Sequence, residues 1–170
     1  MTPNPPDPVD AVLDQWRHEY PALAVEAMGT IGRLKRSSAL IQTALDQVFD
    51  EFELASWEFD VLATLRRSGP PFCLAPTALF SSLMITSGTM TNRLKRLESR
   101  ALIERVANEH DARSSLVQLT EAGRAVIERA LFPHVANEER LLSQLSDEER
   151  AALDHGLRAL LRVLEQSPRG

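Results

Sequence analysis

The feature that most constrains the fold is a change of hydrophobic period in the middle of the chain. Residues 76–83 and a segment from 86 or 87 to about 100 have the apolar spacing of two short helices, and Pro76 suits a helix N-terminus. Residues 103–107 and 115–119 instead have the character of short strands joined by a polar loop. Two short helices followed by a hairpin predict a winged helix–turn–helix domain.

Helical patterns precede this region. Apolar residues recur at helical spacing over 9–19 and again from 31 to 52. Ser56 is a suitable N-cap for a third helix, with Glu58 near its positive end. That helix is expected to end at the breaker Ser68-Gly69-Pro70-Pro71.

Two long helices are predicted after the hairpin. Thr120 caps the first, and Pro133 lies inside its pattern, where we expect a kink. Ser146 and Glu149 form a capping box that opens the last helix. The sequence therefore predicts a mainly α fold with a small β-hairpin (α+β).

Composition excludes several classes of protein. The 170 residues are 44% apolar and 25% charged, with no apolar run long enough to span a membrane, and the proline-rich start is unlike a signal peptide. We therefore expect a cytoplasmic protein. One cysteine, Cys73, excludes an intramolecular disulfide framework and a multi-cysteine zinc site. The four histidines lack metal-ligand spacing, and no catalytic motif is present, so we expect no metal, no cofactor and no enzyme activity.

The charge distribution points to an anionic partner. The net charge is −5, yet residues 91–105 hold five basic and two acidic side chains. A basic island in an acidic chain suits nucleic acid, although a solvated helix face would carry the same charges.

The second short helix has the two faces of a recognition helix. Met90, Leu94, Leu97 and Ala101 gather on one side, where they can hold the helix on the domain. Small polar and basic side chains, which can contact bases or phosphates, lie on the opposite side and its flanks. The alternative is an ordinary amphipathic surface helix. The predicted DNA contacts are Ser87, Thr89, Thr91, Asn92, Lys95 and Arg96.

The loop between the two predicted strands completes the DNA-binding prediction. Its tip carries Arg113, which can enter a narrow minor groove, where the negative potential is enhanced. Asp111 can hold that arginine in position; a simple Asp111–Arg113 pair is the alternative.

These segments resemble the MarR family of dimeric transcription regulators. The resemblance is carried by Thr86-Ser87-Gly88-Thr89-Met90-Thr91-Asn92-Arg93-Leu94, by Asp111-Ala112-Arg113 and by Leu119-Thr120-Glu121-Ala122-Gly123-Arg124. Ala101 departs from the family, which commonly has glycine after the recognition helix. If that position is left-handed, alanine there costs on the order of 1 kcal/mol.

A narrower resemblance is to the PecS/urate-responsive (UrtR-like) subgroup, through Trp16-Arg17, Pro21, Met28-Gly29 and Ile31-Gly32-Arg33. It implies that Trp16, Asp60, Arg93 and Arg105 bind urate or a related anionic ring. On the helical wheel Arg93 lies beside the apolar stripe, where it can reach beneath the recognition helix toward Asp60. Alternatively, Asp60–Arg93 is a structural ion pair, Arg105 a phosphate contact and Trp16 part of a dimer core.

The resulting hypothesis is a dimeric, ligand-responsive repressor that binds pseudo-palindromic duplex DNA. The alternatives are a redox-sensing regulator that uses Cys73 and a helical interaction module that does not bind DNA. We expect a disordered lead at 1–8, helices for dimerisation and the ligand pocket at 9–55, the winged helix–turn–helix domain at 56–120, and dimerisation helices at 121–170.

Overall fold

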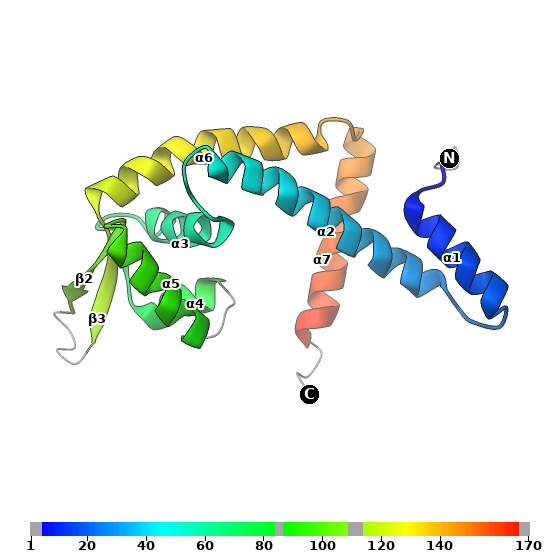
Figure 1. The fold of residues 1–170 in the computed structure, drawn as a ribbon, viewed down its shortest axis with the longest axis horizontal. Helices are drawn as coiled ribbons and strands as arrows, with labels where there is room; N and C mark the ends of the chain where they lie inside the picture. Colours follow the sequence, from blue (N-terminus) through cyan, green and yellow to red (C-terminus); the bar gives the residue numbers. More distant parts are fainter. Residues whose placement is uncertain (1–4, 84–86, 109–113, 167–170) are drawn as a thin grey trace. The chain divides into compact units, whose positions relative to one another are not determined.

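The structure is a computed structural model that describes residues 5–83, 87–108 and 114–166, with the backbone alone for 87–90. In this part of the chain helices predominate and the strands are short (Figure 1). The elements are α1 (Pro8–Glu19), α2 (Glu26–Asp50), α3 (Ser56–Arg67), β1 (Cys73–Leu74), α4 (Pro76–Leu83), α5 (Ser87–Ser99), β2 (Ile103–Ala107), β3 (Ser115–Leu119), α6 (Glu121–Leu142) and α7 (Asp147–Gln166).

The chain forms two compact units, Met1–Ala44 and Leu45–Gly170. The first unit holds α1 and most of α2. The second holds the end of α2 and all later elements. None of the helices in the described residues combines the length and hydropathy needed to cross a bilayer.

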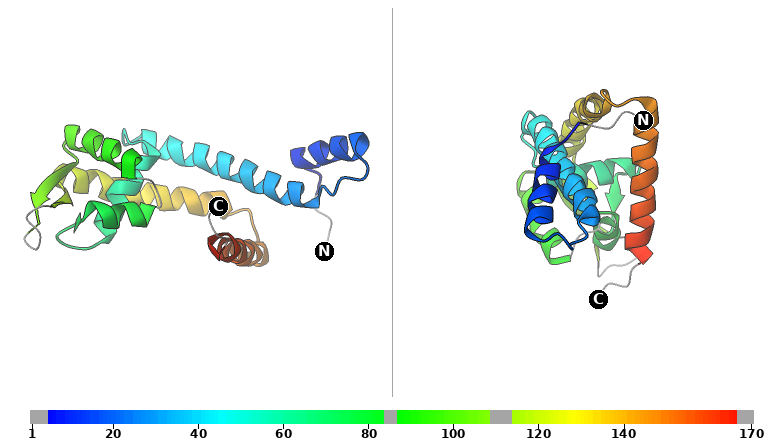
Figure 2. Two further views of the ribbon diagram at one scale, coloured as in Figure 1. Left: turned by 90° about the horizontal axis from the view of Figure 1, so that it is seen from below. Right: turned by 90° about the vertical axis from the view of Figure 1, so that its right-hand side faces the viewer.

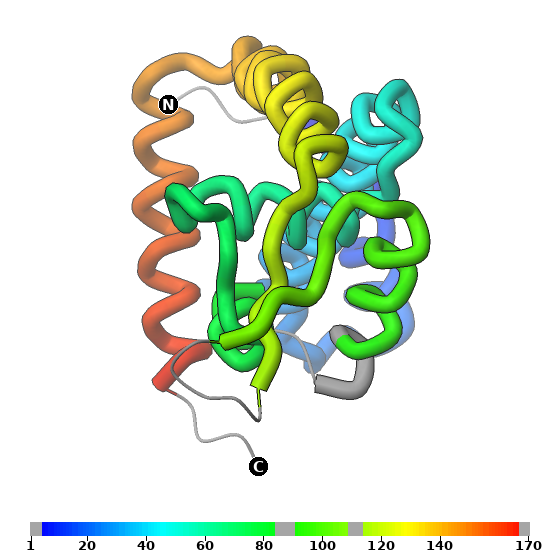
Figure 3. The backbone as a smooth tube through the Cα atoms, turned by 90° about the vertical axis from the view of Figure 1, so that its left-hand side faces the viewer, coloured from blue at the N-terminus to red at the C-terminus, as the bar shows by residue number. Residues whose placement is uncertain are grey.

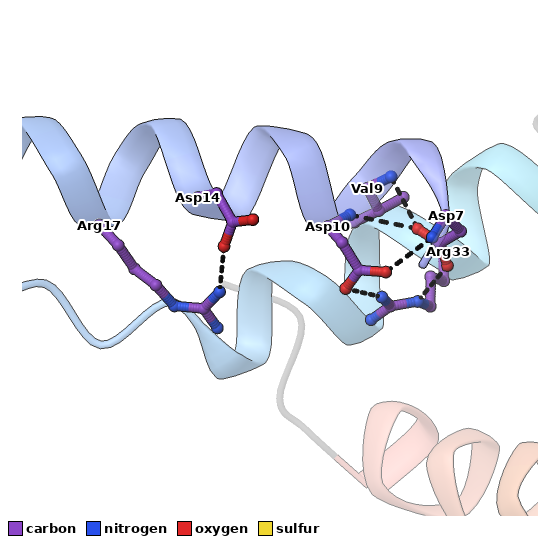
Figure 4. A network of polar contacts seen from close by, with 6 residues as sticks. All are labelled: Asp7, Val9, Asp10, Asp14, Arg17 and Arg33. Atoms are coloured by element: carbon purple, nitrogen blue, oxygen red, sulfur yellow. Dashed lines mark hydrogen bonds and ion pairs between the residues drawn. The ribbon is translucent and has the colours of Figure 1, made fainter. Parts of the chain in front are cut away.

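In the first unit, Arg33 of α2 is bound to the start of α1. Asp7 caps α1 by accepting from the N–H groups of Val9 and Asp10, and the Asp10 carboxylate accepts from the N–H of Asp7. The Arg33 guanidinium donates to both carboxylates, at 2.6 Å to Asp7 and 2.5 Å to Asp10 (Figure 4). Leu13 is buried where α1 passes close to Gly29. These contacts join α1 to α2.

The core of the second unit is built around α3. Helix α3 buries one face against α4, α6 and the sheet, while α5 packs against α4 and β2. The sheet is antiparallel with the order β1-β3-β2, and Arg105 lies opposite Val117. Helix α6 begins beside the sheet and extends away from it, and α7 follows its far end (Figure 2). The largest fully buried side chains of this core are Phe49, Val61, Leu62, Leu65, Leu79, Leu94, Leu97, Val117 and Ile127.

The α5–β2 turn and the β3–α6 junction lie side by side (Figure 3). Ala101, two residues after the end of α5, has φ +54°, and the next N–H, that of Leu102, donates to the carbonyl of Leu97. This geometry is a left-handed helix C-cap. Thr120 donates its hydroxyl to the carbonyl of Ala101 and accepts from the N–H of Gly123, so one side chain joins the turn to α6.

The predicted elements are largely confirmed, with two differences. The structure adds a third strand, β1, which at two residues is too short to show alternation. The N-cap of α3 is Ala55 rather than Ser56, because Glu58 accepts the N–H of Ala55 and takes over the capping. As predicted, helix α6 contains Pro133, whose missing N–H removes one hydrogen bond without ending the helix.

Candidate nucleic-acid interface and ligand site

Helix α5 presents the predicted recognition face to solvent. Its base is anchored by Leu94 and Leu97, which are 1% and 0% exposed. Ala101 does not belong to this base, since it lies exposed beyond the helix end. The exposed side chains of α5, here called the recognition face, are Thr91, Asn92, Lys95, Arg96 and Ser99.

Four predicted DNA-contact or wing residues are not placed by side chain. Ser87 and Thr89 lie on α5, whose first turns are described by backbone alone. Asp111 and Arg113 lie outside the described residues.

The C-terminal end of α5 is fixed to the α2–α3 turn through Arg100. Its guanidinium donates at 2.6 Å to Oε2 of Glu58, whose side chain is only 3% exposed, and at 2.8 Å to the carbonyl of Glu53. Oε1 of Glu58 is buried without a hydrogen bond. Sequence reasoning assigned Glu58 only a favourable charge at a helix N-terminus and missed its partner, which lies 42 residues away.

A second contact between α3 and α5 is centred on Trp57. The Cζ atoms of Arg93 and Arg96 lie 5.4 Å and 5.2 Å from the centroid of its indole ring. Both distances are within the range of cation–π attraction. Arg93 therefore reaches α3, the helix that carries Asp60, as the helical wheel predicted. Trp57 itself was missed, because a tryptophan near a helix start gives no signal of what faces it.

Asp60 lies on α3 in a partly desolvated position. Desolvation raises the pKa of its carboxyl group, while electrostatic interactions with Arg93, His134 and Arg67 act in the opposite direction. Asp60 is thus an exposed residue whose carboxyl group lies within the electrostatic influence of Arg93 and Arg67. Such a group can respond when a nearby cation is drawn to a ligand.

Arg105 lies on β2 and interacts with α5. Its Nε donates to Glu98 at 3.1 Å, and Nη1 lies 3.5 Å from the hydroxyl of Ser115. Trp16 belongs to the other compact unit, where its ring is 5.8 Å from that of Tyr20. Of the four predicted ligand residues, the structure thus brings Arg93 into the electrostatic environment of Asp60.

A cavity of about 660 Å³ lies between α3 and α6, and none of the four predicted ligand residues lines it. Its wall includes Phe59, Arg67 and His134. The His134 ring lies 4.5 Å from Phe59, its Nε2 is 3.3 Å from Glu138, and its Nδ1 is buried without a hydrogen bond. This cavity is separate from the Arg93–Trp57 contact.

Cys73 is half-buried on β1, and burial raises the pKa of its thiol. Redox-sensing cysteines depend on a lowered pKa, which keeps the reactive thiolate populated. The environment of Cys73 therefore favours the unreactive thiol.

Large apolar side chains are exposed along several helices. On α7 they form a stripe at helical spacing, and no α7 residue in the described range is buried. Exposed apolar area of this extent is typical of an interface with another chain. The α7 stripe consists of Leu153, Leu157, Leu161 and Leu164.

An anchored helix with a polar outer face, preceded by α4 and followed by the β2–β3 pair, defines a winged helix–turn–helix protein. Comparison with known proteins gives the same result. A MarR family model matches residues 53–114. The regulator PecS of Dickeya dadantii (strain 3937) is 46% identical over 158 residues, which cover 93% of each chain. The chain belongs to the MarR family of transcriptional regulators.

Solved structures agree with this assignment. A mutant MarR from E. coli, complexed with operator DNA, matches with a TM-score of 0.71 and 26% identity over 82% of this chain and 99% of that one. AbsC from Streptomyces coelicolor shares the fold, with a TM-score of 0.75 and 20% identity over 85% of this chain and 99% of that one.

Proposed function

We propose that this protein is a dimeric repressor that binds a pseudo-palindromic operator and is released by a small anionic aromatic ligand such as urate. The observation that carries the DNA-binding part is the recognition face: Asn92, Lys95 and Arg96 are exposed on a helix whose opposite side is anchored by the buried Leu94 and Leu97. Asparagine and arginine can bind adenine and guanine through two hydrogen bonds each, and lysine can neutralise phosphate. The operator complex of the E. coli relative supports the same use of this domain.

A second copy of the chain would place two recognition faces on one duplex. The exposed leucine stripe of α7 supports dimerisation, since a monomer leaves it in contact with water. A two-fold dimer reads half-sites about 34–36 Å apart in successive major grooves. The operator is therefore an inverted repeat.

The ligand would be recognised by Asp60, Arg93, Arg105 and Trp16. Two guanidinium groups suit an anion, and an indole suits a flat ring. The electrostatic influence of Arg93 on Asp60 supports a link between this site and α5. An anion that draws Arg93 away changes how α5 is held, and a coupling typical of allostery weakens DNA binding about 5–150-fold.

The test uses the full-length protein and the inverted-repeat duplex that it selects from a random pool. We expect affinity to fall steeply with salt concentration, because neutralised phosphates release counterions. Adding urate should weaken the wild-type complex, whereas Arg105→Ala should be insensitive. Arg158→Ala, which removes only an exposed pair with Asp154, serves as the matched control. A wild-type complex that is indifferent to urate and related purines would remove the proposed ligand, and selection of no duplex would remove the DNA-binding function.

A further inference from the structure

Trp57 contacts both a predicted ligand residue and a predicted DNA residue. Arg93 and Arg96 are three positions apart on α5 and therefore lie on neighbouring turns of one helix face. Both guanidinium groups lie over the indole of Trp57, at 5.4 Å and 5.2 Å from its centroid. The indole of Trp57 thus contacts two cations. The proposed function assigns Arg93 to the ligand and Arg96 to DNA.

The indole is itself held firmly enough to orient these cations. Trp57 is half-buried and packs against the core of the second unit. The next residue, Glu58, is bound by Arg100, which directly follows α5. Two arginines of α5 and the residue after this helix therefore contact two consecutive residues of α3.

Stacking on an indole leaves a guanidinium able to bind an anion. The attraction uses the face of the planar guanidinium, whereas its five N–H donors point outward in its plane. An arginine that stacks on Trp57 loses rotamer freedom before it meets its partner, which lowers the entropy cost of binding. The same argument applies to Arg96 with DNA and to Arg93 with an anionic ligand.

We propose that Trp57 is a positioning residue that orients Arg96 toward DNA and Arg93 toward the anionic ligand, and thereby links the two sites. This inference rests on the proposed function and adds a residue to it. Its consequence is that removing the indole weakens DNA binding only while Arg96 is present. The effect of one cation–π contact corresponds to about a 2- to 5-fold change in affinity.

The experiment is a double-mutant cycle on binding to the selected inverted-repeat duplex, with wild type, Trp57→Leu, Arg96→Ala and the double variant. Trp57→Leu keeps an apolar, though smaller, side chain and loses the ring, whereas Trp57→Phe keeps an aromatic face. We expect Trp57→Leu to lower affinity about 2- to 5-fold in the wild-type background and to have no effect beside Arg96→Ala, with Trp57→Phe intermediate. Phe52→Leu is the matched control, because it removes a ring 5.8 Å from Arg129 rather than from α5.

A second readout is the emission of Trp57 in a Trp16→Phe background, which leaves it as the one tryptophan. We expect Arg96→Ala and saturating duplex each to change that emission. Equal loss of affinity from Trp57→Leu with and without Arg96, or no loss at all, overturns the proposal while leaving the proposed function standing. If the wild type binds no duplex, the proposed function fails and this inference fails with it.

Discussion

The carbonyl oxygen of Leu102 lies 1.9 Å from the position that a Cβ atom on residue 123 would occupy. The backbone of α6 therefore passes so close to the α5–β2 turn that Gly123 leaves no room for a side chain. Together with the Thr120 cap, this approach explains physically the Leu119-Thr120-x-x-Gly123 pattern that the sequence showed.

Gly123→Ala is expected to destabilise the fold, because the obstructing atom belongs to backbone and cannot rotate away. The free energy of unfolding should fall by about 2–3 kcal/mol, as for an overpacked core position. Urea denaturation measures this change in the free energy of unfolding. Gly156→Ala is the control: nothing lies within 4 Å of a Cβ there, so this change in α7 should stabilise by about 0.5–1 kcal/mol. Similar stabilities for both variants would contradict the close approach.

Ala101→Gly is expected to stabilise the protein. Residue 101 has φ +54°, a left-handed conformation that glycine adopts without the Cβ penalty. The gain in free energy of unfolding should be about 0.5–1 kcal/mol. The matched control, Ala151→Gly inside α7, should lose a similar amount, because there the backbone is helical. A lower free energy of unfolding for Ala101→Gly than for the wild type would contradict a left-handed conformation at residue 101.

Arg100→Ala is expected to destabilise the second unit, since it leaves the buried Glu58 carboxylate without its cation. Arg100 is itself 36% exposed, so solvent screens part of the loss, and we expect about 1–2 kcal/mol. Thermal unfolding provides the measurement. Arg158→Ala, from an exposed pair, should change stability by less than about 0.5 kcal/mol.

Acid should loosen α1 from α2. Hydrogen bonds from Arg33 and from backbone N–H groups hold the pKa values of Asp7 and Asp10 below their ordinary 3.8. Because the folded-state values are depressed, the stabilisation is present above pH 3.8 and is lost as the pH falls through the lower folded values. The protection of the α1 amides, measured as their exchange rate relative to the intrinsic chemical rate at the same pH, should therefore fall on acidification. In Arg33→Ala this protection should already be low at neutral pH, whereas Arg36→Ala should behave as wild type.

Asp60→Asn is expected to stabilise the protein at neutral pH. Desolvation raises the folded-state pKa of Asp60 above its ordinary value of 3.8. The free energy of unfolding therefore falls as the pH rises from 3.8 through the raised pKa, and it stays lower at higher pH. Removing the charge removes that loss of stability, so thermal unfolding should shift upward, and under the proposed function the response to urate should weaken. Asp154→Asn, which only opens an exposed pair, should not raise stability. An unchanged or lowered unfolding temperature for Asp60→Asn would argue against this assignment.

The sequence was sufficient for features that local chemistry determines. The bounds of β2 and β3, the Thr120 cap and the Ser146–Glu149 capping box follow from alternation and from hydrogen bonding within a few residues. Contacts between distant segments were not predictable. Arg100 binds Glu58, and Trp57 contacts two arginines, through long side chains that span from α5 and its C-terminal turn to α3, and no pattern within either helix encodes these pairs. Arg93 was the exception, because its angle beside the apolar stripe already directed it beneath α5.

The close approach at Gly123 also couples the start of α6 mechanically to the α5–β2 turn. Because there is no room between the α5–β2 turn and the first turn of α6, a rotation of one segment would carry the other with it. At about 1.5 Å per residue, α6 is roughly 33 Å long, so a tilt of about 5° at the junction shifts its far end by about 3 Å. A small rearrangement beside the recognition helix is thereby magnified at the distant turn where α7 begins.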